Sequence, residues 1–299
     1  MRLATRASPL ALWQAEHVAG LLRAAHPGLA IDVVRTDTLG DRRIDLPISA
    51  IGGKGVFATE VQRLVLAGDA DAAVHSAKDL PAVTDDGLAL AAVPERGDAR
   101  DALVGRTIDD LAPGATVATG SQRRRVQLAA VRPDLTFIEL RGNMATRLAK
   151  VPDRGAIVVA LVALQRLGLD DAVVQVLGVG EMIPQVGQGA LAVECRSGDE
   201  SIAAVLAAIE HAPSRRRVDA ERAFLAELGG DCDLPAGAHA ELSDRDEVRL
   251  RALLADELGT VHSVEATGTD GPALGVDLAR RLRATPTGGS ARPLPRPSP

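Results

Sequence analysis

The sequence predicts an α/β fold made of two similar α/β halves and a small C-terminal α+β domain. Strand-like and helix-like patterns alternate over the first two-thirds of the 299 residues, which is typical of sheets covered by helices. The last third changes to a long helix, two strands and a further helix. Apolar residues make up 46% and charged residues 25% of the chain, the balance of a globular protein and not of a disordered one.

In the first half, a short strand is expected at 2–5. The helix that follows should have Ser8 as its N-cap and Pro9 at its first position. Apolar residues continue at helical spacing until Pro27 and Gly28 end the pattern. The remaining elements of this half are a strand at 31–34, a glycine-rich loop at 52–55, a helix around 57–65, and a strand at 70–74 that runs into the polar segment 75–79.

The second half repeats the pattern of strand, polar loop and helix, so we expect parallel sheets with helices on both faces. In open α/β sheets, ligands bind beyond the carboxyl ends of strands, where these loops fall. The predicted strands are 116–118, 136–140 and 157–161, with loops at 119–121 and 141–143 and a helix ending near 166–168. The last third should hold a helix at 215–228, strands at 248–255 and 261–267, a helix near 276–282, and a disordered tail from residue 285.

Charge, aromatic content and hydropathy exclude several classes of protein. The net charge of −6 argues against a basic nucleic-acid-binding protein, and an aromatic content of 1% argues against base-stacking platforms. The longest apolar run, 156–164, is shorter than the roughly 20 residues of a membrane span. Arg6 and Glu16 interrupt the N-terminal region where a signal peptide would be apolar, so we expect a cytoplasmic protein. Neither nucleic acid nor a membrane is expected as a partner.

Arginines gather at the predicted loops and helix starts. Any single one could be a solvated surface charge, but several follow a strand end, where helix N-termini and backbone N–H groups favour anions. Arginine binds carboxylates through paired hydrogen bonds, so the array suits a ligand with several carboxylates. A phosphate ligand is less favoured, because no glycine-rich phosphate loop is present. The arginines are Arg6, Arg123, Arg124, Arg141, Arg147 and Arg166, with Ser8, Thr119 and Ser121 as hydroxyl donors in the same loops.

Two residues are candidates for chemistry. Asp79, next to Lys78, could form a salt bridge or cap a helix, or it could be the negative group that stabilises a cation or moves a proton. Cys232 lies in the loop sequence Gly-Asp-Cys-Asp-Leu-Pro, which favours covalent chemistry over core packing. Cys195 is interpreted as a buried strand residue. Metal-ligand spacings such as C-x-x-C are absent, so no metal site is expected.

Taken together, several segments resemble the porphobilinogen deaminase family closely, and they run in order over most of the chain. They are RLATRASPLALWQA at 2–15, GGKGVF at 52–57, AVHSAKDLP at 73–81, TGSQRRR at 119–125, QLAAVRPDL at 127–135, LRGNMATRL at 140–148, LQRLGL at 164–169 and VGQGALAVECR at 186–196.

The resemblance implies two periplasmic-binding-protein-like (type II) α/β domains and a small C-terminal α+β domain. It also implies a transferase of tetrapyrrole (porphyrin, haem) biosynthesis, which condenses four porphobilinogen molecules head to tail, releases ammonia and yields hydroxymethylbilane. A covalently bound dipyrromethane cofactor primes the chain, and the protein is expected to be a monomer. The expected domains are 1–94 with 190–207, then 98–184, then 212–284, with the tail at 285–299.

The resemblance carries over to individual residues. Asp79 matches the catalytic aspartate, and Cys232 matches the cysteine that holds the cofactor through a thioether. Residues that match positions binding the acetate and propionate arms are Arg6, Ser8, Arg123, Arg124, Arg141, Arg147 and Arg166. Further positions around the cofactor and the growing chain are matched by Lys54, Ser76, Lys78, Thr119, Ser121 and Gln188.

Two departures from the family's pattern stand out. Ala50 replaces a lysine that many members have, which puts that cation's role in doubt. Asp231, where members usually have a small residue, and Asp233 flank Cys232, and two carboxylates should raise the pKa of its thiol. We expect Asp231→Gly to change the rate of cofactor attachment, and an unchanged rate of holoenzyme formation would contradict this.

Two alternatives share the fold. A type II binding module for a carboxylate ligand would have the α/β domains but would not explain Cys232 or the third domain. A non-catalytic paralogue would agree with Ala50 and Asp231 but not with the presence of Asp79 and Cys232.

Overall fold

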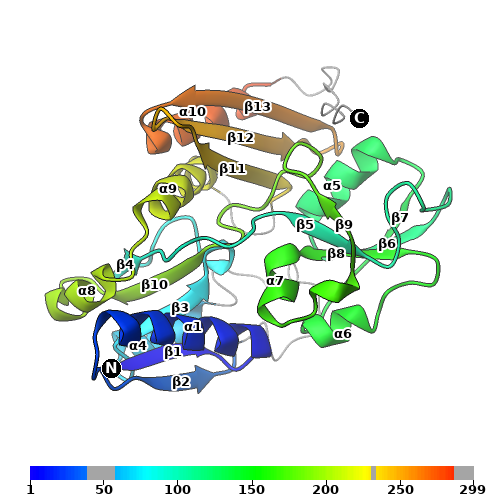
Figure 1. The fold of residues 1–299 in the computed structure, drawn as a ribbon. Helices are drawn as coiled ribbons and strands as arrows, with labels where there is room; N and C mark the ends of the chain where they lie inside the picture. Colours follow the sequence, from blue (N-terminus) through cyan, green and yellow to red (C-terminus); the bar gives the residue numbers. More distant parts are fainter. Residues whose placement is uncertain (39–57, 230–233, 286–299) are drawn as a thin grey trace. The chain divides into compact units, whose positions relative to one another are not determined.

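The computed structural model describes residues 1–38, 58–229 and 234–285 (Figure 1). It contains two compact units. The first unit comprises Met1–Gly97 and Gly189–Arg216, and the second comprises Asp98–Gln188 and Arg217–Pro299. Within the described ranges, no helix is both long and apolar enough to cross a membrane.

The first unit is built on a five-stranded sheet with the order β2-β1-β3-β10-β4. β1 runs parallel to β2 and β3, whereas β10 is antiparallel to β3 and β4. The strands are β1 (Arg2–Arg6), β2 (Asp32–Thr36), β3 (Ala72–Ser76), β4 (Leu88–Ala92) and β10 (Leu191–Arg196).

Helices cover both faces of this sheet. On one face, α1 and α8 bury Val18, Leu22 and Leu206 against strand residues such as Leu3 and Val193. On the opposite face, α4 packs its own valines against alanines of β1 and β3. The helices of this unit are α1 (Pro9–Ala25), α4 (Thr59–Leu66), the 3₁₀ turn η1 (Ala77–Asp79) and α8 (Glu200–Ala207).

The second unit contains a five-stranded sheet of the same design, with the order β7-β6-β8-β5-β9. Three strands are parallel, and β5 lies antiparallel between β8 and β9, as β10 does between β3 and β4. The elements are β5 (Asp101–Val104), β6 (Thr116–Ala118), α5 (Gln122–Val131), β7 (Thr136–Ile138), α6 (Met144–Leu148), β8 (Ala156–Ala160), α7 (Leu161–Arg166), η2 (Asp170–Ala172) and β9 (Val173–Leu177).

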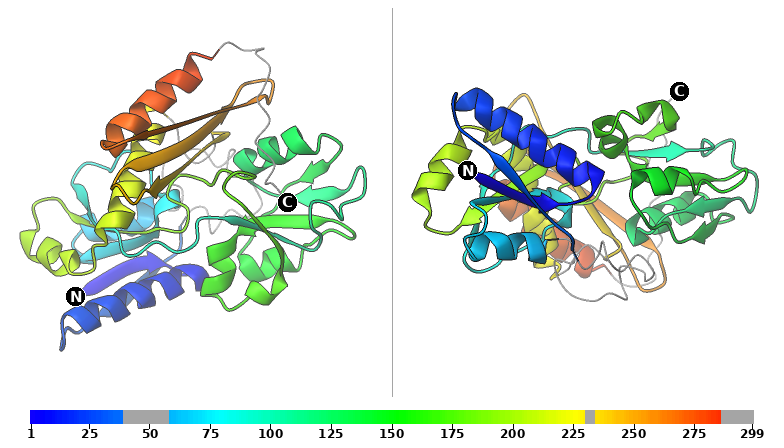
Figure 2. Two further views of the ribbon diagram at one scale, coloured as in Figure 1. Left: turned by 45° about the horizontal axis from the view of Figure 1, so that its top comes forward. Right: turned by 90° about the horizontal axis from the view of Figure 1, so that it is seen from below.

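A three-stranded antiparallel sheet, β11-β12-β13, completes the second unit. The helix α10 lies along one face of this sheet, as the left view of Figure 2 shows. On its other side, Leu253 and Val261 pack with Ile183 and Val126 in one buried cluster. The elements are β11 (Ala236–Leu242), β12 (Val248–Ala255), β13 (Val261–Gly268) and α10 (Gly271–Arg283); α9 (Ala212–Glu227) precedes them in the chain.

The fold confirms the predicted class: two α/β sheets with a shared strand order and a small α+β part. The expectation of parallel sheets is wrong for β5 and β10, which run antiparallel to their neighbours. Each of these strands is the first one after the chain passes from one unit to the other. Local sequence patterns do not reveal where the chain makes this passage. The helix expected near 276–282 begins earlier, at Gly271, with Asp270 as its N-cap. The loop at 52–55 and the tail from 286 lie outside the described residues.

Candidate functional site

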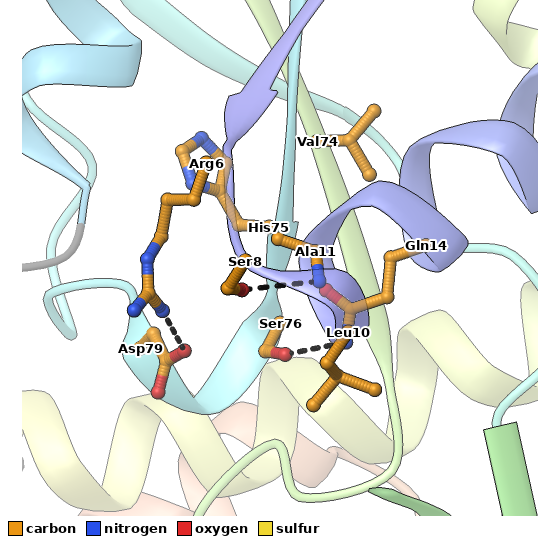
Figure 3. A pocket seen from close by; sticks show the side chains of 9 residues that line it. All are labelled: Arg6, Ser8, Leu10, Ala11, Gln14, Val74, His75, Ser76 and Asp79. Atoms are coloured by element: carbon orange, nitrogen blue, oxygen red, sulfur yellow. Dashed lines mark hydrogen bonds and ion pairs between the residues drawn. The ribbon is translucent and has the colours of Figure 1, made fainter. Parts of the chain in front are cut away.

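A pocket in the first unit lies at the carboxyl ends of β1 and β3. Arg6 is the last residue of β1, and Ser76 ends β3 just before the η1 turn that carries Lys78 and Asp79. The chain therefore brings a cation and a carboxylate together where α/β sheets bind their ligands. The pocket is lined by Arg6, Ser8, Leu10, Ala11, Gln14, Val74, His75, Ser76 and Asp79 (Figure 3).

Arg6 and Asp79 form a loose ion pair across this pocket. Arg6 Nη1 lies 3.7 Å from Asp79 Oδ2, and the two side chains are 21% and 27% exposed. This separation is longer than that of an N–H···O hydrogen bond. Both groups can therefore exchange partners, with Arg6 turning to a ligand carboxylate and Asp79 to a positive charge.

The two serines of the pocket are held by the start of α1. Ser8 is the N-cap of this helix, and its Oγ accepts a hydrogen bond from Ala11 N at 3.3 Å. Gln14 Nε2 donates to Ser76 Oγ at 2.8 Å, which ties α1 to the end of β3. Each hydroxyl accepts in these contacts and keeps its own O–H for a further acceptor. Sequence reasoning singled out both serines but not Gln14.

In the second unit, the loop after β6 is ordered by its own hydroxyls. Thr119 Oγ1 accepts from Ser121 N at 3.2 Å, and Ser121 is the N-cap of α5. The predicted carboxylate ligands Arg123 and Arg124 follow in the first turn of this helix. They are only 2% and 7% exposed, so both side chains lie inside the protein.

Arg123 and Arg124 share one buried carboxylate, Asp101 at the start of β5. Arg123 Nη2 donates to Asp101 Oδ2 at 2.8 Å, and Arg124 Nη2 donates to Oδ1 at 2.8 Å. Gln188 Nε2 donates to the same Oδ1 at 2.8 Å. Backbone carbonyls of Ile183 and Val158 accept further guanidinium N–H groups.

Electrostatics keep Asp101 ionised. Burial by itself would raise the pKa of this carboxyl, but the charges of Arg123 and Arg124 hold it well below its usual range. Arg123, Arg124 and Gln188 thus bind a buried carboxylate inside the protein. Sequence reasoning missed Asp101. An aspartate opening an otherwise apolar strand was the available signal, because a buried carboxylate requires cationic partners.

The other three predicted arginines present a different environment. Within the described residues, the buried Nη1 of Arg141 has no hydrogen-bond partner. Arg147 Nε, from α6, donates to Gly142 O at 2.8 Å, and Lys150 Nζ, just after α6, donates to Arg141 O at 3.2 Å, so both side chains secure the loop that precedes the helix. Burial lowers the pKa of the Arg166 guanidinium to about 10. A desolvated guanidinium and an unsatisfied N–H are both stabilised by an anionic carboxylate.

Lys54 and Cys232 lie outside the described residues, as do Ala50 and Asp231. Cys195 is buried in β10, as the sequence indicated.

The fold and these residues define an α/β protein in which one unit carries an arginine and a carboxylate at strand ends and the other unit carries further arginines suited to carboxylates. A family model described as "Porphobilinogen deaminase, dipyromethane cofactor binding domain" matches residues 1–204, and one described as "Porphobilinogen deaminase, C-terminal domain" matches residues 215–284. A porphobilinogen deaminase of Nitratidesulfovibrio vulgaris is 42% identical over 298 residues, covering 96% of this chain and 94% of the relative. The chain belongs to the porphobilinogen deaminase family.

Similarity to solved structures is more distant. YhfZ from Shigella flexneri has 16% identity and a TM-score of 0.39, covering 78% of this chain and 98% of that one. A TRAP periplasmic solute-binding protein from Desulfovibrio salexigens has 12% identity and a TM-score of 0.40, covering 70% and 72% of the two chains. At these TM-scores neither similarity supports an argument about this chain.

Membership in the family makes the chain an enzyme, a transferase of tetrapyrrole biosynthesis that acts on porphobilinogen and uses a dipyrromethane cofactor. This cofactor carries acetate and propionate arms. Arg141 Nη1, which has no hydrogen-bond partner among the described residues, and the desolvated Arg166 are donors of the type that such arms require, so the residues present fit the cofactor.

Proposed function

We propose that this chain carries out its family's reaction with Asp79 as the catalytic carboxylate and Arg6 as a substrate-binding group. The supporting observation is the loose Arg6–Asp79 pair, 3.7 Å apart, in a pocket at the ends of two strands. A substrate carboxylate that binds Arg6 frees Asp79 from its ion pair. Asp79 then faces the positive charge that develops on the pyrrole when ammonia leaves, and it can take the proton lost after the new bond forms.

The remaining predicted residues hold and orient anionic groups. We assign Arg141 and Arg166 to the carboxylate arms of the cofactor and of the growing chain, because their environment favours an anion. Arg147 is assigned to the same arms because it matches a family position that binds them. When bound through Cys232, the cofactor supplies the anchored pyrrole to which the first substrate is joined. The hydroxyl and ammonium donors assigned to the same task are Ser8, Lys54, Ser76, Lys78, Thr119 and Ser121.

Arg123, Arg124 and Gln188 were also predicted to contact the cofactor or substrate, and this stays a prediction. In the structure they donate hydrogen bonds to Asp101 and to backbone carbonyls. We propose that their main contribution is to shape the second unit beneath the loop of Thr119 and Ser121.

Intact mass separates this proposal from its alternatives. We expect the purified protein to exceed its sequence mass by two linked pyrrole units, and the excess to be absent from Cys232→Ala. Asp79→Asn should keep the excess mass but lose turnover. If the chain stays at its bare mass after incubation with porphobilinogen, the carboxylate-binding module or the non-catalytic paralogue becomes the better description.

Three further predictions concern the domain boundaries, the oligomeric state and the location in the cell. We propose that the three sheets correspond to domains at 1–94 with 190–207, at 98–184 and at 212–284. A monomeric state and a cytoplasmic location stay predictions, which sedimentation and cell fractionation would check.

A further inference from the structure

A row of polar side chains lies on the α4 face of the first sheet, next to the pocket. Leu3, Val74 and Val193 belong to the core on the α1 face. Because side chains alternate along a strand, Arg6, His75 and Glu194 point to the other face. The sheet order β1-β3-β10 places these three residues on successive strands, with His75 in the middle.

The pairing of the strands brings His75 beside Arg6. Leu3 and Ala4 of β1 pair in parallel with Ala72 and Ala73 of β3. Two residues further along each strand are Arg6 and His75, and both line the pocket (Figure 3).

His75 and Glu194 form a buried pair behind this pocket. His75 Nε2 lies 3.2 Å from Glu194 Oε2, and the two side chains are 3% and 1% exposed. Gln62 Nε2, from α4, donates to the same Oε2 at 2.9 Å. Within the described residues, His75 Nε2 and Gln62 Oε1 make no hydrogen bond, so the cluster is only partly satisfied. Such groups are uncommon in a core and call for an explanation.

We propose that the buried His75–Glu194 pair positions the Arg6 guanidinium for substrate carboxylates. This inference rests on the role proposed above for Arg6. Asp79 holds Arg6 only loosely, and a substrate carboxylate would displace that contact. Glu194, whose carboxylate accepts from Gln62, lies on the same face of the sheet one strand beyond His75, and its negative charge in a region of low dielectric favours the Arg6 guanidinium on that face. Arg6 therefore keeps its place when Asp79 turns to the reacting pyrrole.

A double-mutant cycle on the holoenzyme tests this. The variants are Arg6→Gln, Glu194→Gln and their combination, each confirmed by intact mass to carry the cofactor. Because Glu194 acts through Arg6, Glu194→Gln should raise the KM for porphobilinogen about 5-fold with kcat little changed. In the Arg6→Gln background, the same substitution should raise KM by less than about 2-fold. Cys195→Ala is the matched control, since Cys195 is equally buried on the opposite face of the same strand, and its KM should not change.

The outcomes separate the two proposals. If Arg6→Gln leaves KM unchanged, the role of Arg6 itself is wrong. If Arg6→Gln raises KM but Glu194→Gln does not, or raises it by the same factor in both backgrounds, the positioning role is overturned. Should Glu194→Gln fail to fold, His75→Asn takes its place in the cycle, and the same non-additive rise in KM is expected.

Discussion

Asp101→Asn perturbs the most concentrated set of buried charges in the described part of the second unit. The Asp101 carboxylate is 0% exposed and accepts from Arg123, Arg124 and Gln188. Asparagine has nearly the same shape but no charge, and its amide group would face a guanidinium. Among the described residues, no other carboxylate forms an ion pair with either arginine. The variant would therefore leave two buried cations without a counter-ion.

The expected loss of stability is large. Removing one partner of a buried ion pair costs about 3–5 kcal/mol, a substantial part of the roughly 5–15 kcal/mol that stabilises a typical protein. Urea unfolding at pH 7, followed by far-UV circular dichroism, would measure the change. Asp98→Asn is the matched control. Its partner Arg100 is 45% exposed, so that ion pair should contribute about 1 kcal/mol or less.

The difference in the free energy of unfolding between the wild type and Asp101→Asn should also depend on pH. The pKa of Asp101 lies below its usual value of 3.8 in the folded chain, so the unfolded chain takes up the proton first as the pH falls. The stabilisation is therefore full above about pH 5 and fades below about pH 4. If Asp101→Asn loses no more stability than Asp98→Asn at pH 7, the cluster does not act as argued.

Two further predictions concern packing and reactivity. A Cβ on Gly237 would lie 2.7 Å from Pro184 O, so Gly237→Ala should destabilise the chain by about 1–3 kcal/mol. The control Gly180→Ala should not, because nothing lies within 4 Å of a Cβ at that position. Equal unfolding midpoints for the two variants would contradict this. Burial, with a smaller contribution from nearby carboxylates, raises the pKa of the Cys195 thiol, so native Cys232→Ala protein should react with iodoacetamide far more slowly at pH 8 than urea-unfolded protein. Equal rates before and after unfolding would show that Cys195 is accessible.

Much of the fold and part of the site were accessible from sequence. The N-cap of Ser8 before Pro9 and the strand ending at 75–79 appear in the structure near the predicted positions. Asp79 could be singled out because a polar run after a buried strand is a local signal. Arg141 follows a predicted strand in the same way, and its role, like those of Arg147 and Arg166, stays a prediction.

The direction of β5 and β10 could not be predicted in this way. Both strands are short and their patterns of apolar residues are compatible with either direction in a sheet. The pairing with β8 and β3 is set by the path of the chain between the two units. Strand order and direction are thus properties of long-range pairing.

The sequence by itself determined the alternation of strands and helices, the caps that begin the helices and the residue types available at strand ends, because these depend on neighbours a few positions away. Only the tertiary structure decided that Arg123 and Arg124 turn inward to Asp101 and that His75 meets Glu194. These partners lie far apart in the chain, and burial makes the pairing obligatory, since a charge removed from water requires a counter-charge close by.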